Sequence, residues 1–434
     1  MNVCVVALGK IGLPLAVQCS RRGHRVVGAD ISAAVVELVN GGRAPFPGEA
    51  FLDEWLAEET SAGRLVATTD TVAAVASSDV VIVVVPLMVD AAGVPDFGAI
   101  DAATQSIGAG LRPGTLVSYE TTLPVGTTRD RFTPVLAAAS GLVPEKDMFV
   151  CHSPERVFSG RIFADLRRYP KLVGGIGEES TKRAVTFYES ALEFDVRDDL
   201  PRPNGVWDLG SAEAAELAKL AETTYRDINI AYANELARFS DRAGIDVIAV
   251  IEASNSQPFS HIHRPGVAVG GHCIPVYPRF YLSGHPDALL PAAAREVNEA
   301  MPSYAVARLA EAIGSLQGRR VVVLGAAYRG GVKETAFSGV FGVVDSLRAE
   351  GAVALVHDPL YSDDELVALG FEPYHLGEAC DAAVLQAEHT EYVQLRRDDL
   401  PGIRAVLDGR DVLLESALAA DGVLVVGIGR GTKE

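Results

Sequence analysis

Apolar and polar positions along the chain form two kinds of segment that alternate. Short apolar runs rich in β-branched residues, typical of buried strands, recur at 3–8, 26–29, 80–86, 115–121, 148–154 and 171–176. Longer segments with helical periodicity separate most of these runs, and the first of them covers about 13–22. Strands that alternate with helices predict a parallel sheet covered by helices on both faces.

The pattern changes to one continuous helix between 211 and 243. This segment contains no internal glycine or proline, and its leucines and isoleucines recur at near-helical spacing. Ser211 is suited to cap its start and Gly244 to end it. About 33 residues make a helix of about 50 Å, a length that usually connects two domains and often lies in a subunit interface. The proline-rich stretch 199–207 before it is predicted to be a linker.

The strand pattern returns near residue 318 with "GRRVVVLGAAYRGG" and continues at 352–359, 382–389 and 422–429. The predicted fold class is therefore α/β, with two Rossmann-like doubly wound domains joined by a central helical region that contains one long helix. We expect the boundaries of the three regions at 1–200, 201–300 and 301–434.

Composition narrows the classes of function. The 434 residues are 48% hydrophobic and 22% charged, and no apolar run approaches the ~20 residues of a membrane span. The net charge is −19 and no basic run exceeds two residues, which argues against nucleic-acid binding. The five cysteines include no CxxC pair, which argues against a zinc ribbon and favours a reducing compartment. Because the first residues, "MNVCVVALG", have a strand pattern and not that of a signal peptide, we expect a cytoplasmic protein. We expect no metal site.

The turn after the first strand, "VVALGKIGLPLA", carries a partial dinucleotide fingerprint. A G-x-G-x-x-G pattern would place glycines at 7, 9 and 12, but residue 7 is Ala7. Gly9 and Gly12 remain, and they are the glycines that admit a pyrophosphate and let helix and strand pack closely. By itself such a turn is as often an ordinary βα turn, but Asp30 at the end of the second strand is placed to bind ribose hydroxyls and favours NAD over NADP.

Four further residues have chemistry that a catalytic site could use. Thr122 and Glu155 each follow a predicted strand, and the carboxyl ends of parallel strands meet at the ligand-binding edge of such a sheet. Lys219 lies on the long helix, and Cys273 follows two glycines in "PGVAVGGHCIPVYP". Each has an ordinary structural alternative: a solvated lysine, a helix-capping glutamate or a buried apolar cysteine.

The order of six motifs resembles the UDP-glucose/GDP-mannose dehydrogenase family over essentially the whole chain, and most closely its UDP-N-acetylhexosamine branch. These motifs are "LGKIGLPLA", "ETTLPVGTT", "SPERVFSGRI", "ETTYRDINIAYANELA", "GGHCIPVYP" and "LDGR". The resemblance implies an N-terminal NAD domain, a central helical region that forms a homodimer or part of a larger homo-oligomer, and a C-terminal domain that binds a UDP-sugar.

The resemblance also implies a reaction, in which the C6 alcohol of the sugar becomes a carboxylate in two hydride transfers to NAD. Cys273 would form a thiohemiacetal and then a thioester. Thr122 and Glu155 would position water, and Lys219 with Thr223 would stabilise oxyanions. The implied cofactor-binding residues are Gly9, Lys10, Ile11, Gly12, Asp30, Pro86 and Thr122. The implied substrate-binding residues are Glu155, Arg156, Val157, Lys219, Arg264, Gly270, Gly271, Lys333 and Arg410.

Four positions depart from the family pattern. Ala7 replaces a glycine, Thr223 an asparagine, Tyr277 an aspartate, and Ala336 an arginine for which Lys333 could substitute. Three alternatives stay open: UDP-glucose as the substrate, a two-electron oxidation that ends at an aldehyde or keto sugar, and a non-catalytic protein that binds nucleotide sugars.

Overall fold

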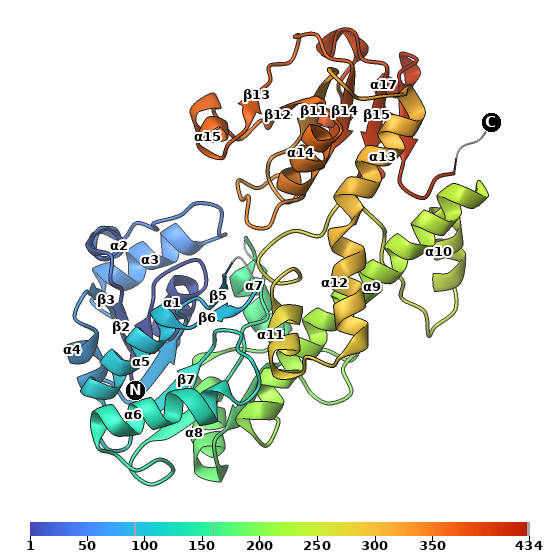
Figure 1. The fold of residues 1–434 in the computed structure, drawn as a ribbon. Helices are drawn as coiled ribbons and strands as arrows, with labels where there is room; N and C mark the ends of the chain where they lie inside the picture. Colours follow the sequence, from blue (N-terminus) through green and yellow to red (C-terminus); the bar gives the residue numbers. More distant parts are fainter. Residues whose placement is uncertain (91–92, 159, 432–434) are drawn as a thin grey trace. The chain divides into compact units, whose positions relative to one another are not determined.

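The computed structural model describes residues 1–90, 93–158 and 160–431. The chain divides into two compact units, Met1–Glu222 and Thr223–Glu434. Each unit contains a mainly parallel sheet with helices, so the α/β prediction is confirmed (Figure 1).

An eight-stranded sheet forms the first unit, with the order β10-β9-β8-β7-β4-β1-β2-β3. Its strands are β1 (Asn2–Val6), β2 (Arg25–Ala29), β3 (Leu65–Thr68), β4 (Val80–Val83), β7 (Leu116–Tyr119), β8 (Phe149–His152), β9 (Lys171–Gly175) and β10 (Val206–Asp208). The short strands β5 (Met88–Val89) and β6 (Pro95–Asp96) form a separate pair.

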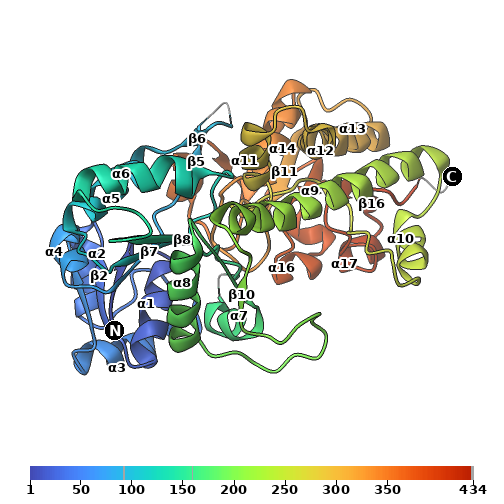
Figure 2. The ribbon, with the colours of Figure 1, turned by 90° about the horizontal axis from the view of Figure 1, so that it is seen from below.

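Helices cover both faces of this sheet. They are α1 (Gly12–Arg21), α2 (Ala33–Asn40), α3 (Leu52–Ser61), α4 (Thr71–Ala76), α5 (Gly98–Gly110), α6 (Thr133–Ser140), α7 (Ile162–Arg168) and α8 (Glu178–Ala191), with a π-helical turn, η1 (Thr127–Phe132). Figure 2 shows α5 and α6 on one side of β7 and β8, and α1 and α8 on the other. The apolar side chains of α1, α3, α7 and α8 share one core with alternate residues of the strands.

Two details of the first sheet correct the sequence prediction. The sheet is not wholly parallel, because β9 runs antiparallel to β8. Helix α7 lies between these strands in the chain, and the chain re-enters the sheet at the edge where β8 ended. In addition, the stretch 199–207 is not a linker to its end, because its last residues begin β10, which pairs with β9.

The long helix is α9 (Ala212–Ala243), within one residue of its predicted bounds. The Ser211 hydroxyl oxygen accepts a hydrogen bond from the Ala214 amide at 3.2 Å, which is an N-cap. Gly244 has φ +67°, the left-handed conformation that ends many helices. Both capping predictions are confirmed.

The second unit holds a six-stranded parallel sheet with the order β13-β12-β11-β14-β15-β16. Its strands are β11 (Arg320–Leu324), β12 (Val353–His357), β13 (Glu372–Pro373), β14 (Ala382–Leu385), β15 (Ala405–Asp408) and β16 (Leu424–Gly427). Its helices are α10 (Val247–Asn255), α11 (Tyr277–Gly284), α12 (Leu289–Glu299), α13 (Met301–Ile313), α14 (Gly339–Ala349), α15 (Asp363–Ala368), α16 (Thr390–Val393) and α17 (Ala417–Ala420), with a 3₁₀ turn, η2 (Arg397–Asp399).

Alternate residues of β11 point to opposite faces of this sheet, and each face has its own core. Val321 and Val323 join a core with α13 and α14, whereas Val322 and Leu324 join one with α16 and α17. Among the helices that the structure describes, none has the length and apolar character needed to cross a bilayer.

Candidate active site

The strand order of the first unit gathers five predicted site residues at one edge of the sheet. β8, β7, β4, β1 and β2 are parallel neighbours in that order. The segments that follow them carry, in the same order, Glu155, Thr122, Pro86, Gly9 and Asp30. This carboxyl edge is where open α/β sheets bind their ligands.

The turn between β1 and α1 has the shape that a dinucleotide phosphate requires. A Cβ on Gly12 would lie 1.9 Å from the Ala7 carbonyl oxygen, so this position admits only glycine. A Cβ on Gly9 would meet no atom within 4 Å, which leaves open space over the turn. Lys10 is exposed and Ile11 half-buried on the same turn. The open backbone and the N-terminus of α1 therefore fit the pyrophosphate of NAD.

Asp30 is tied to the same turn. One carboxylate oxygen accepts a hydrogen bond from the Leu8 amide at 2.8 Å, and the other accepts one from the Ser32 amide at 2.9 Å. Two amides fill only part of the capacity of a carboxylate, so Asp30 can still accept hydrogen bonds from ribose hydroxyls.

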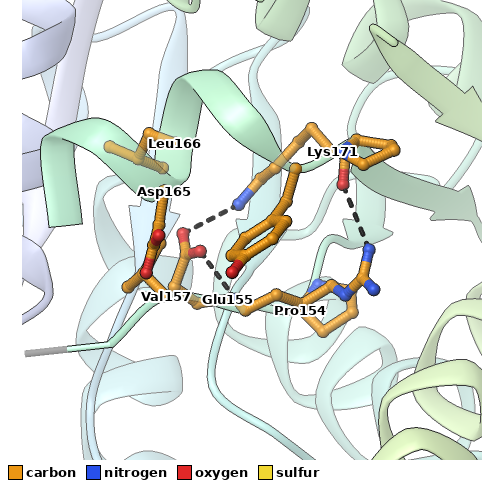
Figure 3. A pocket seen from close by; sticks show the side chains of 9 residues that line it. Pro154, Glu155, Val157, Asp165, Leu166 and Lys171 are labelled. Carbon is orange, nitrogen blue, oxygen red and sulfur yellow. Dashed lines mark hydrogen bonds and ion pairs between the residues drawn. The ribbon is translucent and has the colours of Figure 1, made fainter. Parts of the chain in front are cut away.

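A cluster of buried charges stands behind Glu155. The Lys171 ammonium lies 2.6 Å from a Glu120 oxygen. It also lies 3.1 Å from a Glu155 oxygen, a contact drawn in Figure 3. The side chains of Glu120, Lys171 and Glu155 are 0%, 4% and 13% exposed. The Tyr188 hydroxyl donates to Glu120 at 2.5 Å, and Glu155 also accepts from the Arg156 amide at 2.7 Å.

The three groups of this cluster shift one another's pKa. Burial raises the pKa of Glu120 to about 7, although the attraction of Lys171 opposes the rise. Burial would also raise the pKa of Glu155, but Lys171 and the Arg156 amide outweigh it and hold this pKa below its usual value. Burial lowers and the two carboxylates raise the pKa of Lys171, with a net rise. At neutral pH the cluster therefore contains a charged lysine and an ionised Glu155.

Sequence reasoning missed Glu120 and Lys171. The sequence pattern predicts 171–176 to be a parallel strand. The first residue of a parallel strand lies at the amino edge of the sheet, away from the ligand-binding carboxyl edge. Because β9 is antiparallel to β8, its first residue, Lys171, lies instead beside Glu155 at the carboxyl edge. The length of the segment between the two strands gave no signal of this reversal, because it suffices for a parallel crossover.

Two glutamates of α9 fix this helix to the loops of the site, and the sequence analysis named neither. Glu216 accepts hydrogen bonds from the Gly126 amide at 2.6 Å and from the Thr128 amide and hydroxyl at 2.9 and 2.7 Å. Glu222 accepts from the Arg156 guanidinium at 2.7 Å. Lys219 is three residues from each glutamate and is buried. The helix therefore holds Lys219 between the loop of Thr122 and the loop of Glu155.

The remaining candidates belong to the second unit. Cys273 is half-buried, whereas Cys4, Cys19, Cys151 and Cys380 are buried. The Cys273 carbonyl oxygen accepts from the Val276 and Tyr277 amides at 3.3 and 2.9 Å, so Cys273 lies in the turn that leads into α11. Thr223, one turn after Lys219 on α9, is buried at the start of this unit.

The two glycines before Cys273 pack against another loop of the same unit. A Cβ on Gly270 would lie 2.7 Å from the Tyr328 Cβ, and Gly271 has φ +91° with the Tyr328 ring beside it. The Gly271 amide donates to the Ala336 carbonyl at 3.1 Å. These glycines are therefore required for close packing on the turn after β11. This packing fixes the backbone before Cys273.

Three cations predicted to bind substrate have protein partners. Arg410 donates to the Gln386 and Tyr328 carbonyls at 2.6 and 3.2 Å, and burial lowers its pKa. The exposed Lys333 lies 2.6 Å from Glu365, and Arg264 pairs with Glu252 and Asp411 at 3.2 and 3.1 Å. Arg410 thus has the most constrained guanidinium of the three.

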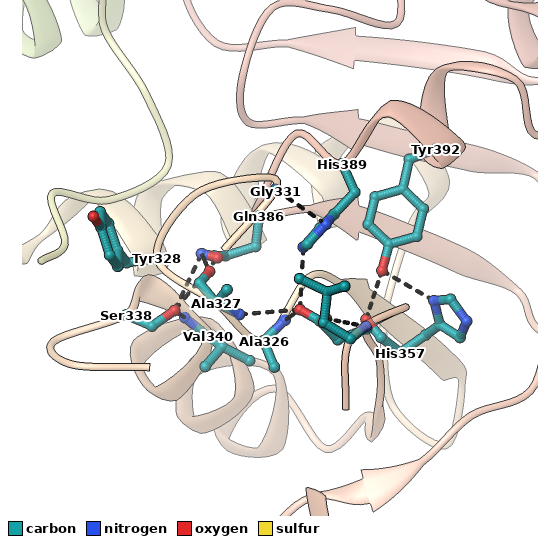
Figure 4. A network of polar contacts seen from close by, with 12 residues as sticks. Ala326, Ala327, Tyr328, Gly331, Ser338, Val340, His357, Gln386, His389 and Tyr392 are labelled. Atoms are coloured by element: carbon teal, nitrogen blue, oxygen red, sulfur yellow. Dashed lines mark hydrogen bonds and ion pairs between the residues drawn. The ribbon is translucent and has the colours of Figure 1, made fainter. Parts of the chain in front are cut away.

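A polar network fixes the turn after β11 (Figure 4). Asp358, which follows β12, accepts from the Ala326 and Ala327 amides at 2.8 and 3.1 Å and lies 3.2 Å from the His389 imidazole. The Gln386 side-chain Nε2 donates to the Ala327 carbonyl at 3.0 Å. Asp358 occupies the place in this sheet that Asp30 occupies in the first, and here it braces the turn that carries Tyr328.

Comparison with known proteins matches three family models in chain order. They describe the NAD binding domain of the UDP-glucose/GDP-mannose dehydrogenase family at residues 1–192, its central domain at 213–300 and its UDP binding domain at 322–415. Among curated proteins, the UDP-N-acetyl-D-mannosamine dehydrogenase of Pyrococcus horikoshii is 34% identical, with 99% of this chain and 100% of that protein covered.

Two further similarities agree with these matches. The NDP-N-acetyl-D-galactosaminuronic acid dehydrogenase of Ralstonia nicotianae is 31% identical over 96% of this chain and 98% of that protein. The solved structure of the UDP-D-ManNAc dehydrogenase from Pyrococcus horikoshii superposes with a TM-score of 0.86 at 32% identity and covers 99% of both chains.

Proposed function

The chain belongs to the UDP-glucose/GDP-mannose dehydrogenase family, and from this membership we propose that it oxidises the C6 alcohol of a UDP-N-acetylhexosamine to a carboxylate. It is an NAD-dependent nucleotide-sugar dehydrogenase. Relatives whose names specify N-acetylmannosamine support the choice of sugar. UDP-glucose is the second candidate, because the family as a whole includes UDP-glucose dehydrogenases.

The observation that carries the proposal is the largely buried Glu155 carboxylate at the carboxyl edge of the NAD-binding sheet, 3.1 Å from the Lys171 ammonium. Bound NAD supplies the acceptor for each hydride that leaves C6. Gly9 leaves room for its pyrophosphate, Gly12 lets α1 pack closely on the turn after β1, and Asp30 binds its ribose. A carboxylate at the same edge can take a proton, directly or through water, when the alcohol is oxidised.

Cys273 is the nucleophile of the proposed reaction. An aldehyde at C6 has no hydride to give until a nucleophile adds to it, so the Cys273 sulfur attacks C6 and forms a thiohemiacetal. Departure of the second hydride leaves a thioester. Water then adds to the thioester carbon, the sulfur leaves as thiolate, and the product is a carboxylate. Cys273 suits this role because the other four cysteines are buried, and burial raises the pKa of Cys4, Cys19 and Cys151 to about 12.

The other site residues act on oxygen atoms. Glu155 and Thr122 position the water that attacks the thioester. The Lys219 ammonium stabilises the oxyanion by charge, and the Thr223 hydroxyl adds a hydrogen bond where the family has an asparagine amide.

Binding of the substrate involves a second set of residues. Arg156 and Val157, which line a small pocket with Glu155, contact the sugar in this proposal. Arg410, Arg264 and Lys333 supply positive charge to the diphosphate, and Gly270 with Gly271 shapes the backbone around the sugar. We also propose that the protein acts as a homodimer or a larger homo-oligomer.

Counting NADH against sugar tests the proposal. Purified protein is incubated with NAD and, separately, UDP-N-acetylmannosamine, UDP-N-acetylglucosamine and UDP-glucose. Two NADH per sugar are expected with an N-acetylhexosamine. One NADH, with a product that reacts with hydroxylamine, would mean that oxidation stops after two electrons and would overturn the cysteine mechanism. Turnover of UDP-glucose alone would overturn the choice of sugar.

A cysteine variant tests the nucleophile. Cys273→Ser is expected to lower steady-state turnover by at least about 10³-fold, because a serine hydroxyl is a much weaker nucleophile than a cysteine thiolate. Cys380→Ser changes a buried cysteine and serves as the matched control. Equal rates for Cys273→Ser and the unchanged protein would remove this thiol from the mechanism.

A further inference from the structure

Two carboxylates and one ammonium are buried together behind the candidate site. Lys171 contacts Glu120 at 2.6 Å and Glu155 at 3.1 Å, and both Lys171 and Glu120 are almost fully buried. Removing a charge from water is costly unless it is paired and hydrogen-bonded. A cluster with one more carboxylate than ammonium therefore requires a specific arrangement to keep either acid ionised.

The contacts assign a different part to each acid. Glu120 lies on the inner side, where the Tyr188 hydroxyl donates to it at 2.5 Å. Glu155 lies on the outer side, where it also accepts from the Arg156 amide and lines the pocket of Figure 3. Lys171 lies between them, at the first position of β9.

Several titratable groups surround this cluster. Asp165 of α7 lines the same pocket as Glu155, and the Arg156 side chain next to it pairs with Glu222. His152, Cys151 and Cys19 lie within the field of Lys171 or Glu120, and burial keeps all three uncharged by lowering the pKa of the histidine to about 3 and raising the pKa of both thiols to about 12. These three groups therefore do not offset the charges of the two acids.

We propose that Lys171 and Glu120 are positioning residues for Glu155: Lys171 keeps the Glu155 carboxylate ionised and fixes its direction, and Glu120 holds Lys171 in place from the buried side. This inference rests on the proposed role of Glu155 as the group that accepts a proton. A base must be ionised at the working pH. Without the ammonium, two adjacent buried carboxyls would share a proton, as like charges in close contact do.

The pH profile of kcat tests this role. In Lys171→Met, the acidic limb of the profile is expected to move up by about one pH unit or more, with the loss of kcat confined to acidic pH, because Glu155 now ionises later. The KM for NAD should stay the same. Lys171→Arg should restore the limb, since it restores the cation. Adding Glu120→Gln to Lys171→Met should move the limb part of the way back, because the carboxylate that repels Glu155 is gone.

Lys182→Met is the matched control, because Lys182 is an exposed lysine of the neighbouring helix α8. A Lys171→Met variant that loses the same factor of kcat at every pH, or a limb that moves equally in Lys182→Met, would overturn the proposal. If Lys171→Met does not fold, the near-isosteric Glu120→Gln decides. Its limb should move to higher pH, because Lys171 loses the carboxylate that holds it beside Glu155, and an unmoved limb would overturn the proposal.

A measurement without turnover separates this inference from the proposed function. The ¹³C resonance of the Glu155 carboxyl, assigned by its loss in Glu155→Gln, reports ionisation directly in the full chain. A Glu155 pKa that rises in Lys171→Met supports the positioning role even if no UDP-sugar is oxidised. A Glu155 pKa that does not change would overturn the positioning role even in a fully active dehydrogenase.

Discussion

At the scale of single residues, the departure at Ala7 has a structural consequence. Ala7 has φ +76°, a left-handed conformation that costs a residue with a Cβ about 1–2 kcal/mol. Its amide still donates to the Ala29 carbonyl at 2.8 Å, so the turn keeps its shape at the cost of strain. The sequence identified the replaced glycine but could not show whether the backbone had relaxed, because φ depends on how α1 and β1 pack.

Ala7→Gly is therefore expected to stabilise the protein. Relief of the strain outweighs the greater freedom of glycine in the unfolded chain, so the free energy of unfolding should rise by about 0.5–1 kcal/mol. Urea denaturation monitored by circular dichroism measures this change. Ala16→Gly, within the buried part of α1, is the control and should destabilise by about 1 kcal/mol. A loss of stability in Ala7→Gly would contradict the strain argument.

The two glycines of the same turn should respond differently to alanine. Gly12→Ala forces a Cβ to within 1.9 Å of the Ala7 carbonyl oxygen and should lower the free energy of unfolding by more than about 3 kcal/mol. Gly9→Ala meets no atom within 4 Å, so the melting temperature without ligand should be nearly unchanged while the Kd for NAD rises about tenfold or more. Calorimetric titration with NAD measures the second effect. Unchanged NAD affinity in Gly9→Ala would place the pyrophosphate elsewhere.

At the scale of elements, the periodicity of apolar residues predicted where the main strands and the long helix lie. The runs at 80–86, 115–121 and 148–154 contain β4, β7 and β8, and α9 begins and ends at its predicted caps. Short edge strands such as β10 and β13 lack enough residues to show a period. Strand direction is also absent from local pattern, so the reversal of β9, and with it the place of Lys171, could not be predicted.

The attachment of α9 to the loop after β7 should depend on pH through Glu216. Burial raises the pKa of Glu216 from 4.5 to about 7, against the effect of its three hydrogen bonds. The folded chain therefore binds this proton more tightly than the unfolded chain. The resulting stability is complete below about pH 4.5 and is lost as the pH rises through 7.

Glu216→Gln should remove this dependence. Relative to Glu216→Gln, the unchanged protein is expected to lose about 2 kcal/mol of unfolding free energy from pH 5 to pH 8. Groups that titrate in both proteins cancel in this comparison. Urea denaturation at four pH values gives this difference. A constant difference would show that Glu216 is ionised across the whole range, stabilised by the amides of Gly126 and Thr128.

At the scale of the whole molecule, both units use the same order of six strands. β3-β2-β1-β4-β7-β8 in the first unit corresponds to β13-β12-β11-β14-β15-β16 in the second. An aspartate follows β2 in the first unit and β12 in the second, and the two have different contacts. Asp30 accepts a hydrogen bond from one amide of its glycine turn, whereas Asp358 accepts hydrogen bonds from two amides and contacts His389. Sequence pattern predicted the repeated fold, but only the hydrogen bonds show that the second turn is braced by the protein itself.

The proposed homodimer makes a prediction about α9. Tyr225, Tyr232 and Phe239 are 53–59% exposed and lie seven residues apart, so they share one face over four helical turns. In a two-fold interface each substitution acts twice, and Tyr232→Glu would bring two like charges into an apolar contact. Light scattering after gel filtration should show a dimer for the unchanged protein and a monomer for Tyr232→Glu. Phe259→Glu, at a 91% exposed side chain outside α9, should stay dimeric. A dimeric Tyr232→Glu would exclude this face of the helix as the interface.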